Sequence, residues 1–269
     1  MTEELQGKVA IVTGAARGLG RAYAHRLAKL GADVVVTDIN LNSAKEFGEE
    51  LTKDSVVEEI EALGRSSIGV EGDLTNPEAV EQLFEKTLQR FGRVDILVNN
   101  AGGAIAKDSG NLPTKTSLSD LKLLMDVNFQ SAFLCCKAVA PIMKKQKSGI
   151  IINTSSLTAI STLTNGVLAG YGAAKAAVEQ YSRGLAAELG PYGIRVNILS
   201  PGIMMTARIA AQAKERGIGT ESQAEAVPLR RLGVAEDCAG VVEFLATDLS
   251  RYVTGQCISV CGGAALHPN

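Results

Sequence analysis

The chain has 269 residues, 46% of them hydrophobic, which is enough to bury the core of one large α/β domain or two small ones. Its formal net charge is −2 and its basic residues are scattered, so no charged footprint indicates a nucleic-acid or membrane-surface partner. Five cysteines fit no zinc-binding spacing, and two histidines are too few for a histidine-based metal site. The acidic N-terminus lacks the basic start and cleavage site of a signal peptide, so we expect a cytoplasmic protein with free thiols and no bound metal.

Seven short runs rich in Val and Ile alternate with longer helical patterns. The runs are nearly continuous apolar segments, which is typical of parallel strands buried on both faces. They are KVAIVT at 8–13, ADVVVTD at 32–38, SSIGVEG at 66–72, VDILVNN at 94–100, GIIINTS at 149–155, IRVNILS at 194–200 and QCISVCG at 256–262. The helical patterns include Gly18–Leu30, Pro77–Phe91, Leu118–Lys145 and an extended or doubled helix within the long, peripheral segment Asn40–Ser66. This alternation predicts one α/β domain over residues 1–269, with a doubly wound parallel sheet of about seven strands and helices on both faces.

One uncharged run, Gly149–Ala174, is long enough to span a bilayer. It contains many Asn, Thr, Ser and Gly residues, whose polar groups would be unsatisfied in lipid. The run is therefore interpreted as a strand, a polar loop and the start of a helix, without membrane association.

A glycine-rich turn, TGAARGLG at Thr13–Gly20, joins the first predicted strand to an amphipathic helix. Gly14 permits the tight turn, while Gly18 and Gly20 let the backbone approach a pyrophosphate at the helix N-terminus. Many such turns carry glycines for geometry alone, but a turn after the first strand that opens a helix is the context a nucleotide site requires. The turn therefore predicts a nucleotide cofactor.

Tyr171 and Lys175 are four residues apart and share one face of a predicted helix. The pattern occurs by chance in roughly one chain in two of this size, and a solvated lysine is the alternative. A free phenol has a pKa near ~10, but an ammonium about 4 Å away favours the phenolate by roughly 4 kcal/mol, or about three pKa units. The pair therefore predicts an acid–base group that takes the proton of an alcohol while a nicotinamide takes hydride.

The chain resembles the short-chain dehydrogenase/reductase family from about Lys8 to Gly263. The resemblance rests on motifs that occur in order: T-G-x-x-x-G-x-G at Thr13–Gly20, NNAG at Asn99–Gly102, Asn128, a Ser before Y-x-x-x-K at Tyr171–Lys175, and PG at Pro201–Gly202. It implies a Rossmann-type fold, a nicotinamide cofactor and an alcohol or ketone substrate. We expect an NAD-dependent alcohol dehydrogenase or ketone reductase. The alternatives are an NADP-preferring carbonyl reductase, a non-catalytic nucleotide-sensing scaffold, and a methyltransferase that uses an adenosyl cofactor.

The resemblance implies a catalytic set of Asn128, Ser156, Tyr171 and Lys175. Ser156 would bind the substrate oxygen, and Asn128 would kink its helix and hold a water that links Lys175 to solvent. The spacing from Ser156 to Tyr171 is two residues longer than usual in the family, so the loop Leu157–Gly170 is enlarged. Ser155 and Thr158 are therefore alternatives to Ser156.

The resemblance also implies the cofactor site and a substrate lid at about residues 204–227. The cofactor residues are Gly14, Arg17, Gly18, Leu19, Gly20, Asp38, Ile39, Asp73, Leu74, Asn100, Ala101, Gly102, Tyr171, Lys175, Pro201, Gly202, Ile203 and Thr206. Asp73 would contact adenine, or instead cap the helix near Pro77. Asn99 would tie neighbouring strands together. Cys261 stands where the family commonly has Asp, and we assign it no chemistry.

Two residues give opposite indications of cofactor choice. Asp38, at the end of the second strand, can bind free ribose hydroxyls and repels a 2′-phosphate. A surface Asp that caps the next helix is the alternative. Arg17 could contact a 2′-phosphate, but it is flexible, so we expect NAD in preference to NADP.

The predicted pocket wall favours a small neutral alcohol or ketone, because it shows no Arg or Lys clamp. Its members are Ala104, Ile105, Leu157, Leu163, Val167, Leu168 and Met204. Helices Ala173–Leu189 and Leu118–Lys145 carry more apolar surface than one sheet face requires, and in the family such helices pair between subunits. We therefore expect a homotetramer, or failing that a dimer.

Overall fold

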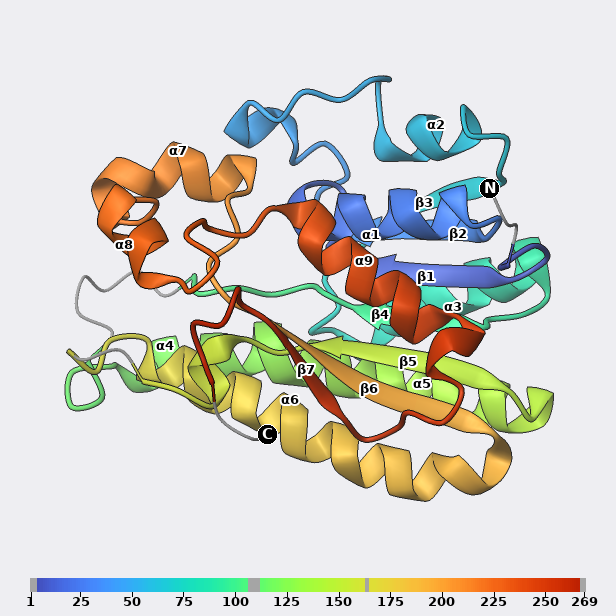
Figure 1. Ribbon diagram of the computed structural model, residues 1–269. Coiled ribbons are helices and arrows are strands. Elements are labelled where there is room, and N and C mark those ends of the chain that lie inside the picture. Colours follow the sequence, from blue (N-terminus) through green and yellow to red (C-terminus); the bar gives the residue numbers. More distant parts are fainter. Residues whose placement is uncertain (1–3, 106–111, 163–164, 267–269) are drawn as a thin grey trace.

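All seven predicted strands form, and they pair into one parallel sheet in the order β3-β2-β1-β4-β5-β6-β7 (Figure 1). The computed structural model describes residues 4–105, 112–162 and 165–266. The strands are β1 Val9–Thr13, β2 Asp33–Asp38, β3 Ser67–Glu71, β4 Ile96–Asn99, β5 Gly149–Thr154, β6 Ile194–Pro201 and β7 Cys257–Val260. The predicted Rossmann-type, doubly wound fold is confirmed.

Helices cover both faces of the sheet (Figure 1). They are α1 Gly18–Lys29, α2 Val56–Glu61, α3 Pro77–Phe91, α4 Leu118–Met125, α5 Ser131–Gln146, α6 Ala169–Leu189, α7 Ala207–Arg216, α8 Glu221–Ala226 and α9 Ala235–Ala246. Helices α1, α2 and α9 enclose one hydrophobic core, and α3, α5 and α6 enclose the other. Neighbouring strand residues serve opposite cores, as Val12 and Ile11 do in β1, which explains why the strands are apolar throughout.

The strand order reverses between β1 and β4, which makes a crevice at their carboxyl ends. The chain passes from β1 to β2 and β3 on one side, and β4 begins the other half of the sheet. Thr13, the last residue of β1, joins the two halves. Its Oγ1 accepts hydrogen bonds from the backbone N–H groups of Asn100 and Ala101, both at 2.9 Å. These hydrogen bonds fix the end of β1 to the loop after β4, on the two sides of the crevice where ligands bind in such sheets.

The segment between β2 and β3 differs from the prediction. It contains a single 3-10 turn, η1 (Lys45–Phe47), and the short helix α2, rather than an extended or doubled helix. Gly48 ends η1 with a left-handed φ of 62°, and Ser55 starts α2 by accepting a hydrogen bond from the Glu58 N–H. The segment is also not peripheral, since its residues Leu41 and Leu51 pack against the core beneath α1.

The predicted helix Leu118–Lys145 forms as α4 and α5, joined by a π-helical turn, η2 (Asp126–Gln130). A π turn interrupts the regular hydrogen-bond ladder and is often found at functional sites. Within the described residues, Leu118–Gln146 is the one helical stretch long and apolar enough to cross a membrane, and 39% of its most apolar window is buried. Core helices of globular proteins meet the same length and composition criteria.

Candidate active site

A cavity of about 830 Å³ opens at the carboxyl ends of the strands. Its lining includes Ser156 and these predicted cofactor residues: Gly14, Arg17, Gly18, Leu19, Asp38, Ile39, Asp73, Leu74, Asn100, Ala101, Gly102, Tyr171, Lys175, Pro201, Gly202, Ile203 and Thr206. Gly20 and Asn128 stand directly behind this lining. A Cβ at Gly20 would lie 2.1 Å from the Gly14 carbonyl oxygen, and one at Gly102 would lie 2.5 Å from Asn128 Oδ1. The structure thus brings the predicted set together around one cavity.

Tyr171 and Ser156 face each other in this cavity. Tyr171 lies in the first turn of α6, and Ser156 precedes the 3-10 turn η3 (Leu157–Ala159). Their hydroxyl groups share a hydrogen bond, and Thr158 Oγ1 donates to Ser156 Oγ at 3.0 Å. Ser155 is held elsewhere, since its Oγ donates to Glu179 Oε1 at 2.8 Å. The enlarged loop therefore leaves Ser156, rather than Ser155, beside the phenol.

The charge balance at Tyr171 differs from the expectation. Burial raises the pKa of Tyr171, and the hydrogen bond from Ser156 and the charge of Arg208 only partly oppose this. Lys175 Nζ lies 5.8 Å from the Tyr171 ring centroid and donates to the Thr154 carbonyl oxygen at 2.8 Å. Burial lowers the pKa of Lys175 itself to about 8. Desolvation thus dominates the pKa of the phenol, and the contributions that lower it come from Ser156 and Arg208, not from Lys175 as predicted.

Asn128 lies within the π turn and clamps the loop that follows β4. Its Oδ1 accepts from the Gly103 N–H at 2.9 Å, and its Nδ2 donates to the carbonyl oxygens of Gly103 and Leu124 at 3.1 and 3.0 Å. The predicted departure from regular helix is present at Asn128. Its side chain positions the loop that lines the cavity, and the water relay stays a prediction.

Asp38 and Asp73, the two residues predicted to contact adenosine, both line the cavity. Asp38 Oδ2 accepts from the Ala16 N–H at 3.1 Å, which ties the end of β2 to the glycine-rich turn. Burial raises the pKa of Asp38, while the N–H groups of Ala16 and Asn40 and the charge of Arg17 act in the opposite direction. Asp73 Oδ1 accepts from the N–H and the hydroxyl of Thr75, so Asp73 shapes the turn before α3 in addition to lining the cavity.

Asn99 acts as predicted and ties neighbouring strands. Its Nδ2 donates to Asn153 Oδ1 at 2.8 Å, which links the ends of β4 and β5. The predicted pocket wall is mostly present, since Ala104, Ile105, Leu157, Leu168 and Met204 line the cavity. Val167 is not among the described lining residues, and Leu163 lies outside the described residues.

No Arg or Lys clamp was expected in the wall, whereas the structure places an arginine there. Arg208, on helix α7 within the segment predicted to be a lid, lines the cavity, and its guanidinium nitrogens lie 3.1 Å from the position of a Cβ on Gly103. Sequence spacing did not reveal this residue, because only the folding of α7 over the cavity places it there. Cys261 also lines the cavity, where it packs against Gly202.

Comparisons with known proteins agree with this architecture. Residues 14–265 match the family model described as Enoyl-(Acyl carrier protein) reductase. The chain is 44% identical to a cyclohexanol dehydrogenase of Rhodococcus sp. (strain TK6), covering 96% of each chain, and 39% identical to a 3-oxoacyl-[acyl-carrier-protein] reductase of Synechocystis sp., covering 97% and 98%.

Solved structures agree as well. A 7α-hydroxysteroid dehydrogenase complexed with NADH and 7-oxoglycochenodeoxycholic acid superposes with a TM-score of 0.84 at 33% identity, over 100% of this chain and 98% of that one. The protein named gox2181 superposes with a TM-score of 0.86 at 32% identity, over 97% and 98%. With these relatives and the glycine-rich turn, Ser156, Tyr171 and Lys175 gathered at one cavity, the chain belongs to the short-chain dehydrogenase/reductase family of nicotinamide-dependent oxidoreductases.

Proposed function

We propose that the protein is an NAD-dependent oxidoreductase that interconverts a secondary alcohol and a ketone. The observation that carries the proposal is the hydrogen-bonded pair of Tyr171 and Ser156 in a cavity that extends to the glycine-rich turn and Asp38. A hydroxyl pair at one end and a nucleotide cradle at the other are the two parts that a coupled proton and hydride transfer requires.

The residues present fit a dinucleotide. The turn between β1 and α1 is tightly folded, because Gly20 packs against Gly14 with no room for a side chain. Such a turn lets the backbone approach a pyrophosphate. Asp38, held by the Ala16 N–H, offers an acceptor to ribose hydroxyls. When bound, the nicotinamide accepts hydride from the carbinol carbon or returns it to the carbonyl carbon.

Within this scheme the chain's own residues handle the proton. Tyr171 accepts the hydroxyl proton during alcohol oxidation and donates it during ketone reduction. Ser156 binds the substrate oxygen, and the buried ammonium of Lys175 adds positive charge behind the phenol. Arg208 acts in the same direction, because its charge lowers the pKa of Tyr171.

The substrate class is proposed from the cavity wall and from one relative. The wall contains apolar groups from Ile105, Leu157, Leu168 and Met204. The relative from Rhodococcus is named for cyclohexanol, so a small cyclic secondary alcohol is the substrate we propose first. We further propose that the protein is a homotetramer in the cytoplasm, and the free cysteines in the described part of the chain are consistent with that reducing compartment.

The test is a turnover screen with purified protein. Cyclohexanol and other secondary alcohols are offered with NAD⁺ and with NADP⁺, and formation of the reduced nicotinamide is followed by absorbance. In the reverse direction, cyclohexanone is compared with a 3-oxoacyl thioester. We expect alcohol-dependent reduction of NAD⁺. A strong preference for the thioester with NADPH would instead support the alternative of an NADP-preferring carbonyl reductase, and reduction of a 3-oxoacyl thioester is the activity for which the Synechocystis relative is named.

A further inference from the structure

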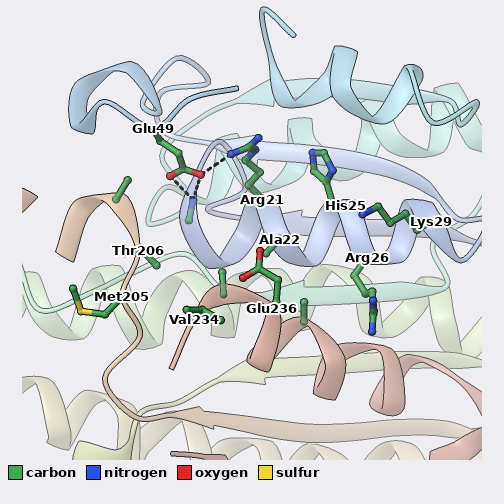
Figure 2. A pocket seen from close by; sticks show the side chains of 14 residues that line it. Arg21, Ala22, His25, Arg26, Lys29, Glu49, Met205, Thr206, Val234 and Glu236 are labelled. Atoms are coloured by element: carbon green, nitrogen blue, oxygen red, sulfur yellow. Dashed lines mark hydrogen bonds and ion pairs between the residues drawn. The ribbon is translucent and has the colours of Figure 1, made fainter. Parts of the chain in front are cut away.

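The segment Leu41–Leu51, here named the cover segment, lies over the start of α1. Its Glu49 accepts hydrogen bonds from the Gly18 N–H at both carboxylate oxygens, at 3.1 and 2.9 Å. Arg21 Nη1 donates to Glu49 Oε1 at 3.1 Å, as Figure 2 shows. Arg17, at the N-cap of α1, makes no capping hydrogen bond within the described residues. A carboxylate 31 residues away in sequence therefore caps the helix beside the nucleotide site.

The same segment also holds Arg17. The Arg17 guanidinium lies over the ring of Phe47, with its central carbon 4.4 Å from the ring centroid. This is a favourable cation–π geometry. Phe47 ends η1, and the left-handed Gly48 turns the chain so that Glu49 follows at the helix start. One turn of the cover segment thus holds both the Arg17 side chain and the Gly18 backbone.

The cover segment is anchored rather than loose. Ala44 is fully buried, and just beyond the segment Thr52 donates through its N–H and its hydroxyl to Glu59 Oε1, at 2.6 and 2.8 Å. Glu59 in turn accepts from Arg21 Nη2 at 2.7 Å. On the other side, η1 packs against lid helix α7, and Figure 1 shows the two side by side. The positions of Phe47 and Glu49 are therefore set by contacts with the core, with Glu59 and with α7.

We propose that the cover segment excludes a 2′-phosphate from the nucleotide site, with Phe47 and Glu49 as specificity-determining residues. Phe47 holds the guanidinium of Arg17, the cation of the glycine-rich turn, against its ring, and this competes with contact between Arg17 and a phosphate. Glu49 occupies the Gly18 N–H, which a phosphate could otherwise use, and the negative charge that its pairing with Arg21 leaves disfavours a phosphate dianion. The inference rests on the NAD preference in the proposed function, and it assigns part of that preference to a segment far from Asp38 in sequence.

The test measures binding, not turnover. The dissociation constants of NAD⁺ and NADP⁺ are determined by titration calorimetry for wild type and variants, without substrate. Phe47→Ala frees Arg17 and is expected to shift the ratio about tenfold toward NADP⁺, and Glu49→Gln about threefold, the scale of one partly exposed charge contact. Phe47→Leu keeps the apolar volume without the ring and should match Phe47→Ala.

Two controls make the test specific. Glu50→Gln removes the same charge one residue away at an exposed position, and it should leave the ratio unchanged. Arg17→Ala combined with Phe47→Ala should abolish the gain of Phe47→Ala, since Arg17 is the group set free. If the wild type prefers NAD⁺, and Phe47→Ala and Phe47→Leu leave the ratio of the two dissociation constants unchanged, this inference alone is overturned. A gain that persists without Arg17 would also overturn it, and a wild type that prefers NADP⁺ would overturn the NAD preference as well.

Discussion

At the scale of single residues, the buried ammonium of Lys175, which we propose assists the reaction, lowers the stability of the folded protein. Burial lowers its pKa from 10.5 to about 8. Between these two pH values the unfolded chain binds more protons, so this group makes the free energy of unfolding rise with pH from about 8 to 10.5. Below that window the buried ammonium destabilises the fold by up to about 3 kcal/mol.

Lys175→Met is therefore expected to be inactive yet more stable at pH 7. The lost hydrogen bond to the Thr154 carbonyl oxygen reduces the gain to about 1–2 kcal/mol. Denaturant unfolding of both proteins at pH 7 and near pH 10.5 measures the difference, which should shrink at the higher pH. Equal free energies of unfolding for the two proteins at pH 7 would contradict the claim that the buried ammonium destabilises the fold.

Alanine variants of the two adjacent serines should have different effects on kcat and on stability. Ser156→Ala is expected to lower kcat by about 10²-fold or more with little change in stability, because Ser156 faces Tyr171. Ser155→Ala leaves Glu179 Oε1 without that donor, so it should lower the free energy of unfolding by about 1–3 kcal/mol while kcat stays near normal. Kinetics and thermal unfolding of both variants check this, and the reverse ranking of kcat would show that Ser155 acts on the substrate.

Sequence reasoning located the residues whose position follows from one element. Gly14 follows β1, Asp38 ends β2 and Tyr171 lies in the first turn of α6, and the parallel sheet gathers these positions at one edge. Arg208 and Glu49 were missed because their positions depend on how a lid helix and a long connection fold back over that edge. Such contacts leave no periodic pattern in the sequence.

At the scale of elements, Glu59 joins α2 to α1 and to Thr52, the residue that follows the cover segment. Burial opposes its ionisation, but hydrogen bonds from Arg21, the Thr52 N–H and His25 outweigh it and lower its pKa from 4.5 to about 2. The resulting stabilisation is present above pH 4.5 and is lost as the pH falls toward 2. Its ceiling is about 3 kcal/mol.

Glu59→Gln should therefore destabilise the protein by about 2–3 kcal/mol at pH 7 and by much less as the pH approaches 2. Urea unfolding at several pH values gives the difference between the two proteins. A penalty that does not change with pH would mean that the carboxylate charge is not what joins these elements.

The strands were predictable because burial on both faces leaves continuous apolar runs, as in β1 and β5. The connection between β2 and β3 was predicted wrongly. Its composition favours a long helix, but Gly48 ends the 3-10 turn η1 and Ser55 starts a separate short helix, α2. The π turn at Asn128 was foreseen only as a local irregularity. The π turn coincides with hydrogen bonds between Asn128 and the loop after β4, and these partners lie outside the helix.

At the scale of the whole molecule, apolar surface remains on helices α4 to α6. Leu118, Leu121 and Leu123 are 82%, 37% and 37% exposed, and Phe133 and Tyr181 form a partly buried aromatic pair across α5 and α6. Two-fold pairing through such faces is the usual route to dimers and tetramers. Light scattering at micromolar concentration should report a tetramer or a dimer, and a monomer there would contradict this expectation.

The central claim is that Tyr171 transfers the proton in an NAD-dependent oxidation. The most direct measurement compares wild type with Tyr171→Phe for NAD⁺ binding by calorimetry and for NAD⁺ reduction with the best alcohol of the screen. Removal of the phenol oxygen leaves the glycine-rich turn and Asp38 untouched, so binding should stay within about threefold while turnover falls at least 10²-fold. Near-normal turnover in Tyr171→Phe, with NAD⁺ still bound, would contradict the claim and remove Tyr171 from the reaction.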